Sequence, residues 1–291
     1  MIRILLLALS LLILPLEAKK YPLGLVAIFK NEAPYLREWI EFHRTVGVEH
    51  FWLYNNGSTD SYREVLQPYI EKKIIELFDW EPTSNEIVNW NKIQCDCYMA
   101  AMKQAKNKAR FVAVLDIDEF LFPVHEKSLI AFLKRYSERR IGGIGVNWQM
   151  YGTSGIQSIP EGRLLIETLI WKGDEHFGEN VHIKSIVRPE AVLDCTNPHS
   201  FHFKPGYLQV DTHKVPFSGP KTASVDASLA RINHYWTRDE DYFWTRKIPR
   251  RAQWGEADFG AIKRAEKLNK VQDTAILRFA PELRRRLGLS P

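Results

Sequence analysis

The chain has 291 residues, of which 40 are Lys or Arg, 35 are Asp or Glu, and 45% are hydrophobic. This apolar content and a net charge of only +5 exclude a disordered chain, and three cysteines are too few to staple a chain of this length. The length suits one large α/β domain or two small ones. The mild basic excess suits an anionic ligand but falls short of a nucleic-acid-binding protein, so no nucleic-acid partner is expected.

The N-terminus carries an apolar run from Ile4 to Leu14, which follows Arg3 and precedes Ala18, a fair residue for signal-peptide cleavage. The run is shorter than the ~20 residues that a bilayer-spanning helix needs. We therefore expect residues 1–18 to be a signal peptide or a short signal anchor, with a buried core segment as the alternative. This predicts a protein of the secretory pathway or one associated with a membrane; the cytoplasmic face stays open as an alternative.

Strands and helices are expected to alternate through the first 120 residues. Short apolar runs predict strands, and amphipathic stretches between them predict helices. The expected strands are 23–29, 50–54, 73–78 and 111–116, and the expected helices are 34–47, one opened by a capping box at 61–64, and 90–108. This alternation predicts an α/β fold with a doubly wound, mainly parallel sheet.

The second half of the chain has a different pattern. Short β-like runs are expected at 141–150, 163–170, 181–187, 200–203 and 207–210, followed by a helical stretch from about Asp239 to the end, with a capping box at 237–240. We expect residues 22–291 to form a single domain. Its parts are a nucleotide-binding half (22–125), an acceptor-binding half (126–250) and a C-terminal helical tail (251–291).

Polar residues follow each expected strand of the first half, at the sheet edge where open parallel sheets bind ligands. The sharpest motif is Asp116-Ile-Asp118, whose carboxylates point to the same side of an extended chain and repel each other. Mg²⁺ or Mn²⁺ would relieve that repulsion and bridge a diphosphate. The alternative is a pair of helix-capping acids, but the apolar strand before the motif favours the metal site.

A dense turn cluster follows the second expected strand, at residues 55–60. Asn56 and Asp60 have side chains that can hydrogen-bond a base or a ribose at the strand end. An ordinary strand-to-helix turn with capping residues explains the cluster equally well. The residue chemistry alone does not choose between these two interpretations.

Together these segments resemble a known family of enzymes. The similar segments are IFKNE (28–32), YLREWIEFH (35–43), YNNGSTD (54–60), LDIDEFLFP (115–123), WQMYGTSG (148–155), KSIVRP (184–189) and INHY (232–235). In this order, and over about residues 22–250, they resemble glycosyltransferase family 92 and the related family 2-like GT-A glycosyltransferases. The resemblance implies a GT-A fold and metal-dependent transfer of a hexosyl group, commonly galactosyl, from a UDP-sugar to a glycan hydroxyl, with inversion.

The resemblance also implies roles for individual residues. Lys30, Asn31 and Glu32 lie where the first strand meets the nucleotide, and Asp60 lies near the uridine. Asp116 and Asp118 form the metal-binding D-x-D motif with Mn²⁺ or Mg²⁺, His234 completes the site, and His202 is the runner-up. Arg238 stands where lysine is expected after the His-Tyr pair, and it is assigned to the donor's phosphate.

The expected mechanism is a single in-line displacement in which cations assist the departing diphosphate. The candidates for this role are Lys184, Arg188, Arg238 and Arg246. Asp174 or Glu175 is the expected catalytic base, and Glu167 and Glu179 lie in the same half of the chain. Tryptophans of the second half are expected to form a stacking wall for the acceptor sugar: Trp148, Trp171, Trp236, Trp244 and Trp254.

The cysteines lack the spacing of a zinc site. Cys95 and Cys97 are expected to be buried thiols on a helix, and a bridge from either to Cys195 stays open if the chain is exported. Two other functions also stay open. One is a metal-dependent phosphoester hydrolase, and the other is a non-catalytic GT-A-fold protein that binds glycan or nucleotide.

Overall fold

The computed structural model describes residues 19–84, 86–253 and 258–290. The segment expected to be a signal peptide or anchor, residues 1–18, lies outside these ranges. Within them, no helix combines the length and the apolar character that crossing a membrane requires.

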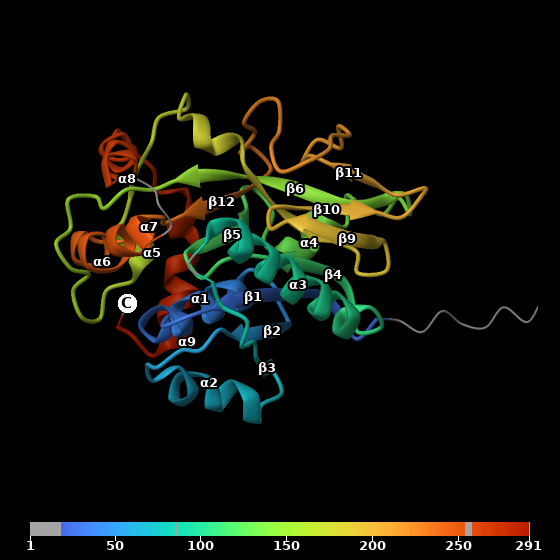
Figure 1. Cartoon of the computed structure of the whole chain (residues 1–291), viewed down its shortest axis with the longest axis horizontal. Helices are drawn as coiled ribbons and strands as arrows, with labels where there is room; N and C mark the ends of the chain where they lie inside the picture. Colours follow the sequence, from blue (N-terminus) through green and yellow to red (C-terminus); the bar gives the residue numbers. More distant parts are fainter. Residues whose placement is uncertain (1–18, 85, 254–257, 291) are drawn as a thin grey trace, which may run out of the picture.

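A nine-stranded sheet forms the centre of the domain (Figure 1). Its strand order is β3-β2-β1-β4-β8-β6-β12-β5, with β11 paired to β6. Strands β1 to β4 are mutually parallel and β12 is parallel to β6, whereas β8 runs antiparallel to β4 and β6. The expected doubly wound, mainly parallel sheet is therefore confirmed. The strands are β1 (Tyr21–Phe29), β2 (His50–Asn55), β3 (Ile75–Asp79), β4 (Ala109–Val114), β5 (Glu119–Pro123), β6 (Ile141–Met150), β8 (Ile183–Val187), β11 (Leu208–Val210) and β12 (Ala230–His234).

Helices cover the sheet, and two small antiparallel strand pairs lie beside it (Figure 1). The pairs are β9 (Val192–Asn197) with β10 (Ser200–Phe203), and β7 (Trp171–Lys172) with β13 (Val271–Gln272). The helices are α1 (Ala33–Thr45), α2 (Tyr62–Glu71), α3 (Ile87–Ala105), α4 (Leu129–Leu133), α5 (Leu165–Thr168), α6 (Glu240–Tyr242), α7 (Ile248–Gln253), α8 (Asp258–Glu266) and α9 (Ala280–Leu287). A π-helical stretch, Phe243–Lys247, joins α6 to α7.

Strand β1 is apolar along its length because both faces of the sheet are covered. Leu25 and Ala27 belong to the core cluster shared with α1, while Val26 and Ile28 belong to the cluster shared with α3. This alternation is the two-residue period of a strand, and burial on both sides explains the continuous apolar run.

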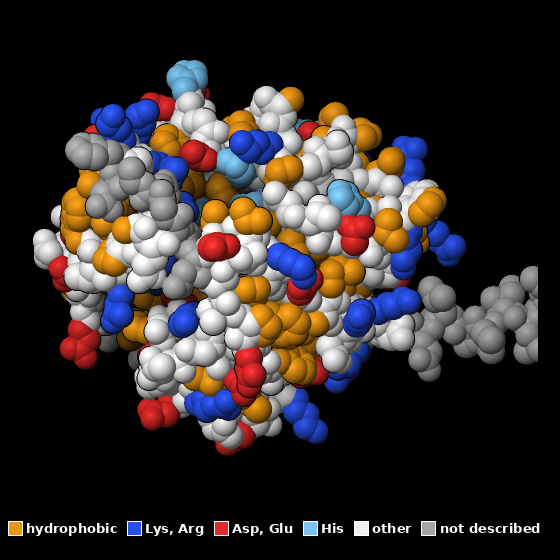
Figure 2. All heavy atoms as spheres, in the orientation of Figure 1, with side chains coloured by type: hydrophobic (Ala, Val, Ile, Leu, Met, Phe, Trp, Pro, Cys, Tyr) orange, Lys and Arg blue, Asp and Glu red, His pale blue; other side chains and the backbone are white. Residues whose placement is uncertain are grey.

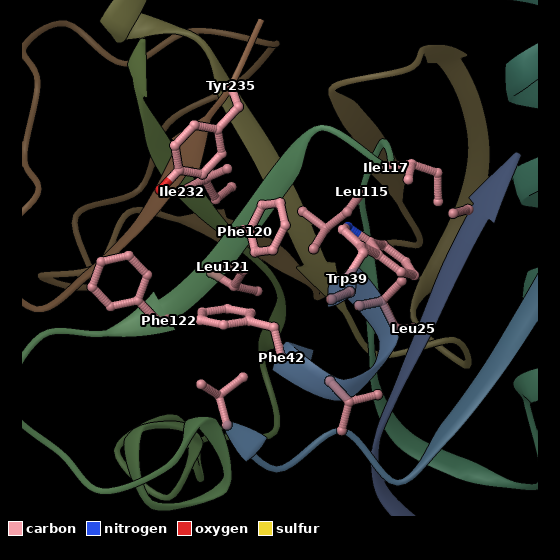
Figure 3. Packing of buried hydrophobic residues seen from close by; sticks show 14 of the residues in the cluster. Leu25, Trp39, Phe42, Leu115, Ile117, Phe120, Leu121, Phe122, Ile232 and Tyr235 are labelled. Carbon is pink, nitrogen blue, oxygen red and sulfur yellow. The ribbon is translucent and has the colours of Figure 1, made fainter. Parts of the chain in front are cut away.

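The larger core cluster includes the contact between α1 and β5, a strand that the sequence patterns did not predict. Phe42 of α1 meets Phe120 of β5 edge to face, with ring centroids 5.1 Å apart. Trp39 lies in the same cluster (Figure 3). Its indole N–H donates to the carbonyl of Glu119 at 2.9 Å. The residues that directly follow the D-x-D motif are thereby packed against α1.

Several predictions of element type or of helix caps are wrong. Residues 163–170, expected to be β-like, contain helix α5, whose first amides donate to the carboxylate of Glu38 on α1. Ser61 does not cap α2 with its side chain, and Asp239, not Thr237, caps α6. The helical tail is divided into α6 to α9 and includes strand β13. Each of these differences reflects a contact with a residue that is not adjacent in sequence or a choice between neighbouring capping groups.

The three cysteines are free. Of the two bridges that the sequence left open, the structure brings together the thiols of Cys95 and Cys195, whose hydrogen bond lowers the pKa of Cys95. Cys97 instead packs in the smaller core cluster, where burial raises its pKa.

Candidate active site

Two adjoining cavities open beyond the carboxyl ends of the parallel strands. The first, which we call the carboxylate cleft, has a volume of about 310 Å³ and is lined by Asp116, Asp118 and His234. The second, the loop cavity, has a volume of about 790 Å³. It brings together the five residues expected to bind the nucleotide: Lys30, Asn31, Glu32, Asn56 and Asp60. The two cavities share Lys30, Glu32, Trp90, Tyr242 and Arg250, so they adjoin each other.

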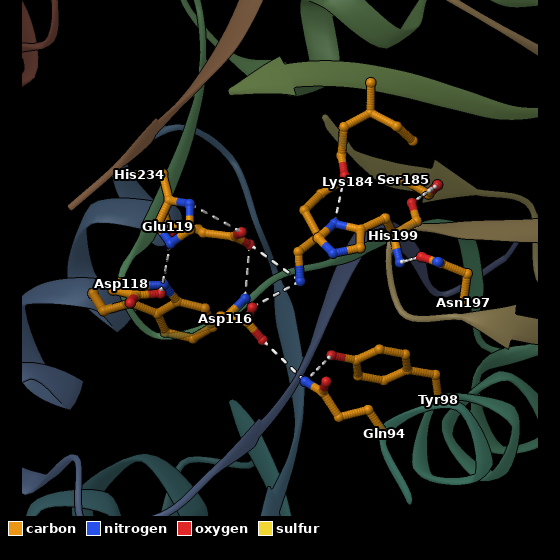
Figure 4. Close-up of polar contacts among 12 residues, drawn as sticks. Gln94, Tyr98, Asp116, Asp118, Glu119, Lys184, Ser185, Asn197, His199 and His234 are labelled. Carbon is orange, nitrogen blue, oxygen red and sulfur yellow. Dashed lines mark hydrogen bonds and ion pairs between the residues drawn. The ribbon is translucent and has the colours of Figure 1, made fainter. Parts of the chain in front are cut away.

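Asp116 is held by a buried lysine from β8. Its Oδ2 accepts from Lys184 Nζ at 2.8 Å, and Lys184 Nζ also lies 3.6 Å from Glu119 Oε2 (Figure 4). The backbone amide of Asp116 donates to the same Glu119 oxygen at 2.9 Å. Burial opposes the charge of Lys184, but Asp116 and Glu119 outweigh it and raise the lysine's pKa. Burial likewise opposes the charge of Asp116, but Lys184 prevails and lowers the aspartate's pKa.

Asp118 lies between a histidine and a second lysine. Its Oδ1 is 3.5 Å from His234 Nε2, and its Oδ2 accepts from Lys247 Nζ at 3.2 Å. Burial disfavours the charged carboxylate, but Lys247 and His234 outweigh it and hold the pKa of Asp118 well below its usual range. Burial lowers the pKa of His234, and it lowers that of Lys247 to about 8.

The three residues expected to hold the metal therefore converge, but they are not arranged as a ready coordination sphere. Within the described ranges, no group of three or more His, Cys, Asp and Glu side chains is positioned to hold a metal ion. The donor chemistry nevertheless fits a hard divalent cation, because two carboxylates and an imidazole face one cleft. His234 Nδ1 and Glu119 Oε1 are also buried without a hydrogen bond in the described structure, and they face each other at 3.9 Å. Lys184 and Lys247 presently neutralise the two aspartates that a metal would share.

The wall of the loop cavity is built from two loops that hydrogen-bond to each other. Asn31, with a left-handed φ of 56°, accepts from the amide of Thr59 at 2.8 Å. Asp60 Oδ2 accepts from the amide of Ala33 at 2.8 Å, and Asn56 donates to the carbonyls of Trp80 and Pro82. Asn56 Oδ1 and Asp60 Oδ1 are buried without a partner among the described residues. Two fixed acceptors are thus available beside the cavity.

Arg238 does not line either cavity. Its side chain is buried, donates to Glu32 Oε2 at 2.6 Å, and lies over the rings of Tyr35 and Tyr242. Arg238 therefore lies behind the site and fixes Glu32, which lines both cavities.

The four candidate bases differ in their surroundings. Glu179 lines the carboxylate cleft, whereas Glu167 pairs with Arg284 at 2.7 Å. Asp174 and Glu175 are exposed and do not line the carboxylate cleft; Asp174 lines a third cavity that adjoins it. Of these four candidate bases, only Glu179 lines the carboxylate cleft together with Asp116 and Asp118.

Some of the other residues expected at the site line one of the two cavities, and others do not. Trp148, Trp236 and Lys184 line the carboxylate cleft, and Arg246 lines the loop cavity. Arg188 instead donates to the carbonyls of Ile141 and Tyr136, and His202 is an exposed residue paired with Asp194. Trp171 and Trp244 do not line the cleft, and Trp254 lies outside the described residues.

Other residues that line the carboxylate cleft were not indicated by the sequence patterns. Among them are Trp90, His182, His199, Lys247, Arg250, Arg251 and Arg264. The basic run from Arg246 to Arg251 could have indicated three of these residues, because it places four cations within six residues.

The fold and site define a class: an α/β protein with paired carboxylates and two adjoining cavities beyond the carboxyl ends of its parallel strands. The family model for glycosyltransferase family 92 matches residues 26–274. The chain belongs to this family, and the sheet order agrees with the GT-A fold expected for it.

The curated relatives are longer than this chain. A family 92 protein of Oryza sativa subsp. japonica is 28% identical over 261 residues, which cover 85% of this chain and 39% of the relative. One of Arabidopsis thaliana is 27% identical over 252 residues, which cover 81% and 40%. The chain thus spans about two fifths of the length of the curated relatives that it matches.

Among solved structures, residues 1–349 of TarS from S. aureus align with a TM-score of 0.39 at 14% identity, covering 91% of this chain and 73% of that one. Glucosyl-3-phosphoglycerate synthase of Mycobacterium tuberculosis, solved with Mn²⁺, UDP and glucosyl-3-phosphoglycerate, aligns with a TM-score of 0.32 at 10% identity, covering 59% and 58%.

Proposed function

We propose that this protein transfers a hexosyl group, galactosyl being the first candidate, from a UDP-sugar to a hydroxyl of a glycan, with inversion. One observation carries this proposal: the carboxylate cleft with Asp116, Asp118 and His234 adjoins the loop cavity and shares lining residues with it. A donor that has a base at one end and a diphosphate-linked sugar at the other matches such a site. Membership of family 92 supports the same reaction class.

The loop cavity is the proposed site for the nucleoside. Asn56 Oδ1 and Asp60 Oδ1 are fixed, buried acceptors, and a uracil ring presents an N–H donor that such an acceptor would bind. Lys30 and Arg250 line both cavities, so they flank the path that the diphosphate would take between them. Cations at that position would stabilise the charge that develops on the leaving group.

Asp116, Asp118 and His234 are the proposed ligands of Mn²⁺ or Mg²⁺. When bound, the metal would act as a Lewis acid on the diphosphate and lower the energy of its departure. Lys184 keeps Asp116 ionised and oriented, because its ammonium is buried against that carboxylate.

In the proposed displacement, an acceptor oxygen forms a bond to the anomeric carbon while the bond from that carbon to the diphosphate breaks. The hydroxyl proton passes to a carboxylate of the protein. We propose Glu179 for this role in preference to Asp174 and Glu175, because Glu179 lines the cleft that contains the D-x-D motif. Trp148 and Trp236 contribute apolar walls beside it.

A UDP-release assay over several UDP-sugars, with and without Mn²⁺, tests the proposal. Metal-dependent release that needs an acceptor is expected, and Asp116→Asn and Asp118→Asn should abolish it. Circular dichroism of each variant separates lost chemistry from lost folding. Absence of both UDP release and Mn²⁺-dependent UDP binding would rule out the transferase. Phosphate release from phosphoesters without acceptor would instead support a hydrolase, and glycan binding that survives both substitutions would support a binding protein.

We also propose that residues 1–18 direct the protein to the secretory pathway or to a membrane. The apolar run between Ile4 and Leu14 supports this proposal. Fractionation of cells that express the full chain tests it, with a chain lacking residues 2–18 as the control. Recovery of both chains in the cytosol would overturn it.

A further inference from the structure

A third cavity adjoins the carboxylate cleft on the side away from the loop cavity. Its volume is about 760 Å³, and it shares Glu179, His182 and Arg264 with the carboxylate cleft. It shares no lining residue with the loop cavity. A ligand in this third cavity would therefore reach the cleft past Glu179, independently of the nucleotide.

The third cavity is strongly basic. Five cations line it, and we call this set the basic annex: Lys221, Lys263, Arg264, Lys267 and Lys270. Only two acids, Asp174 and Glu179, lie among the same lining residues. The lining residues of this cavity therefore carry an excess of three positive charges.

Among the described residues, four of these cations have no counter-ion. Arg264 Nε lies 3.7 Å from Glu179 Oε1, and its guanidinium lies over the ring of Trp236. In the described ranges, no ion pair engages Lys221, Lys263, Lys267 or Lys270. Figure 2 shows Lys and Arg side chains gathered at the upper left, over helix α8. Neighbouring unpaired ammonium groups repel one another, and an anionic ligand would relieve that repulsion.

The annex is built from segments that the fold brings together around the proposed base. Lys263 and Arg264 come from α8, Lys267 and Lys270 from the turn that follows, and Lys221 from the strand bridge to His182. The ring of His182 stacks on Trp148, and its Nδ1 lies 2.9 Å from the carbonyl oxygen of Glu179. Glu179 thus lines the same cavity as the cations of the annex, and His182 lies between it and the ring of Trp148.

We propose that the acceptor is an anionic glycan, and that the basic annex binds its carboxylate or phosphate group while a neighbouring hydroxyl lies beside Glu179. This inference rests on the proposed transferase function and names the class of its acceptor. A second donor site is not consistent with the position of the annex, because the loop cavity already adjoins the carboxylate cleft on its other side.

Direct binding tests this inference independently of catalysis. The probes are labelled hexagalacturonate and its methyl ester, and a phosphate-terminated oligomannoside and its dephosphorylated form. The variant is Lys263→Ala/Lys267→Ala/Lys270→Ala, in which all three side chains are exposed. The matched control is Lys72→Ala/Lys103→Ala/Lys134→Ala, which removes three exposed lysines that line none of the three cavities.

We expect at least one charged probe to bind about tenfold more tightly than its neutral partner, since three surface ion pairs of ordinary strength supply that difference. The annex variant should lose this preference and the control should keep it, while Mn²⁺-dependent UDP binding stays unchanged in both. The probe that is preferred distinguishes carboxylate from phosphate. Equal binding of charged and neutral probes by the wild type, or equal behaviour of the two variants, would overturn the inference. If the proposed transferase function is wrong, UDP release and UDP binding are both absent. This result is distinct from equal binding of charged and neutral probes, which overturns only the inference about the acceptor.

Discussion

Glu32 and Arg238 lie 206 positions apart in the sequence and form a buried ion pair, with Arg238 Nη2 2.6 Å from Glu32 Oε2. The guanidinium lies 3.6 Å from the ring centroid of Tyr35 and 4.3 Å from that of Tyr242. Glu32 follows β1 and Arg238 follows β12, so the pair joins the two halves of the domain beneath the active-site cleft. The contribution of this pair to the free energy of unfolding can be measured with variants of Arg238.

Replacing Arg238 by Ala should lower the free energy of unfolding by about 3–5 kcal/mol, because Glu32 is then left charged and buried without a partner. Arg238→Lys should cost less, since an ammonium keeps the charge but cannot stack as a plane between Tyr35 and Tyr242. Urea unfolding measures both. The double variant Glu32→Gln/Arg238→Met should be more stable than Arg238→Ala; equal midpoints for wild type and Arg238→Ala would contradict the prediction.

Lys247→Met should tighten Mn²⁺ binding in the absence of nucleotide. The ammonium of Lys247 lies 3.2 Å from Asp118 Oδ2 and competes with a cation for that carboxylate. Removing it is expected to raise the affinity about tenfold, equivalent to ~1.4 kcal/mol. Calorimetric titration with Mn²⁺ measures the change. Lys103→Met, on the exposed side of α3, is the control, and an unchanged or weaker affinity in Lys247→Met would count against the assigned metal site.

Glu179→Gln should reduce the turnover number by about 10² or more, which is the usual loss when a general base is removed. Acceptor KM should change by only a few-fold, because the amide keeps the shape of the side chain. Asp174→Asn and Glu175→Gln are the matched comparisons, since both acids lie outside the carboxylate cleft. Loss of turnover in either of these with normal activity in Glu179→Gln would return the role to the acids first expected from the sequence.

His43 should make the fold sensitive to acid. Burial lowers its pKa to about 3, and its Nε2 accepts the amide of Leu121 at 3.2 Å, which a protonated ring cannot do. The folded pKa lies below the unfolded value of about 6.5, so this contribution to stability is present above pH 6.5 and lost as pH falls toward 3. The expected slope reaches about 1.4 kcal/mol per pH unit.

Urea unfolding of the wild type and of His43→Gln at several pH values between 7.5 and 4 measures this effect. The variant should show a shallower dependence of unfolding free energy on pH, even if it is less stable at neutral pH. Identical slopes would show that other groups dominate the acid response.

Local sequence patterns were sufficient for much of the fold. A parallel sheet was predicted from the apolar run of β1 and the helical face of α1, and a site at its carboxyl edge from the polar ends of the strands. The prediction of the sheet is confirmed, because backbone periodicity and burial on two faces leave a pattern within ten residues. Strand β5 was missed because its pairing with β12 joins segments more than 100 residues apart, as Phe120 with Asn233 shows.

That Asp116 and Asp118 would line one cleft at the strand ends was predictable from residue type and position, since a pair of like charges at a strand end requires a nearby cation. Only the tertiary structure revealed that Lys184 and Lys247 provide that charge, that Arg238 lies behind the cleft rather than in it, and that Glu179 rather than Asp174 lines it. These assignments depend on which distant side chains the packing of β8, β12 and the C-terminal helices brings within a few ångströms. Sequence spacing carries no record of those distances.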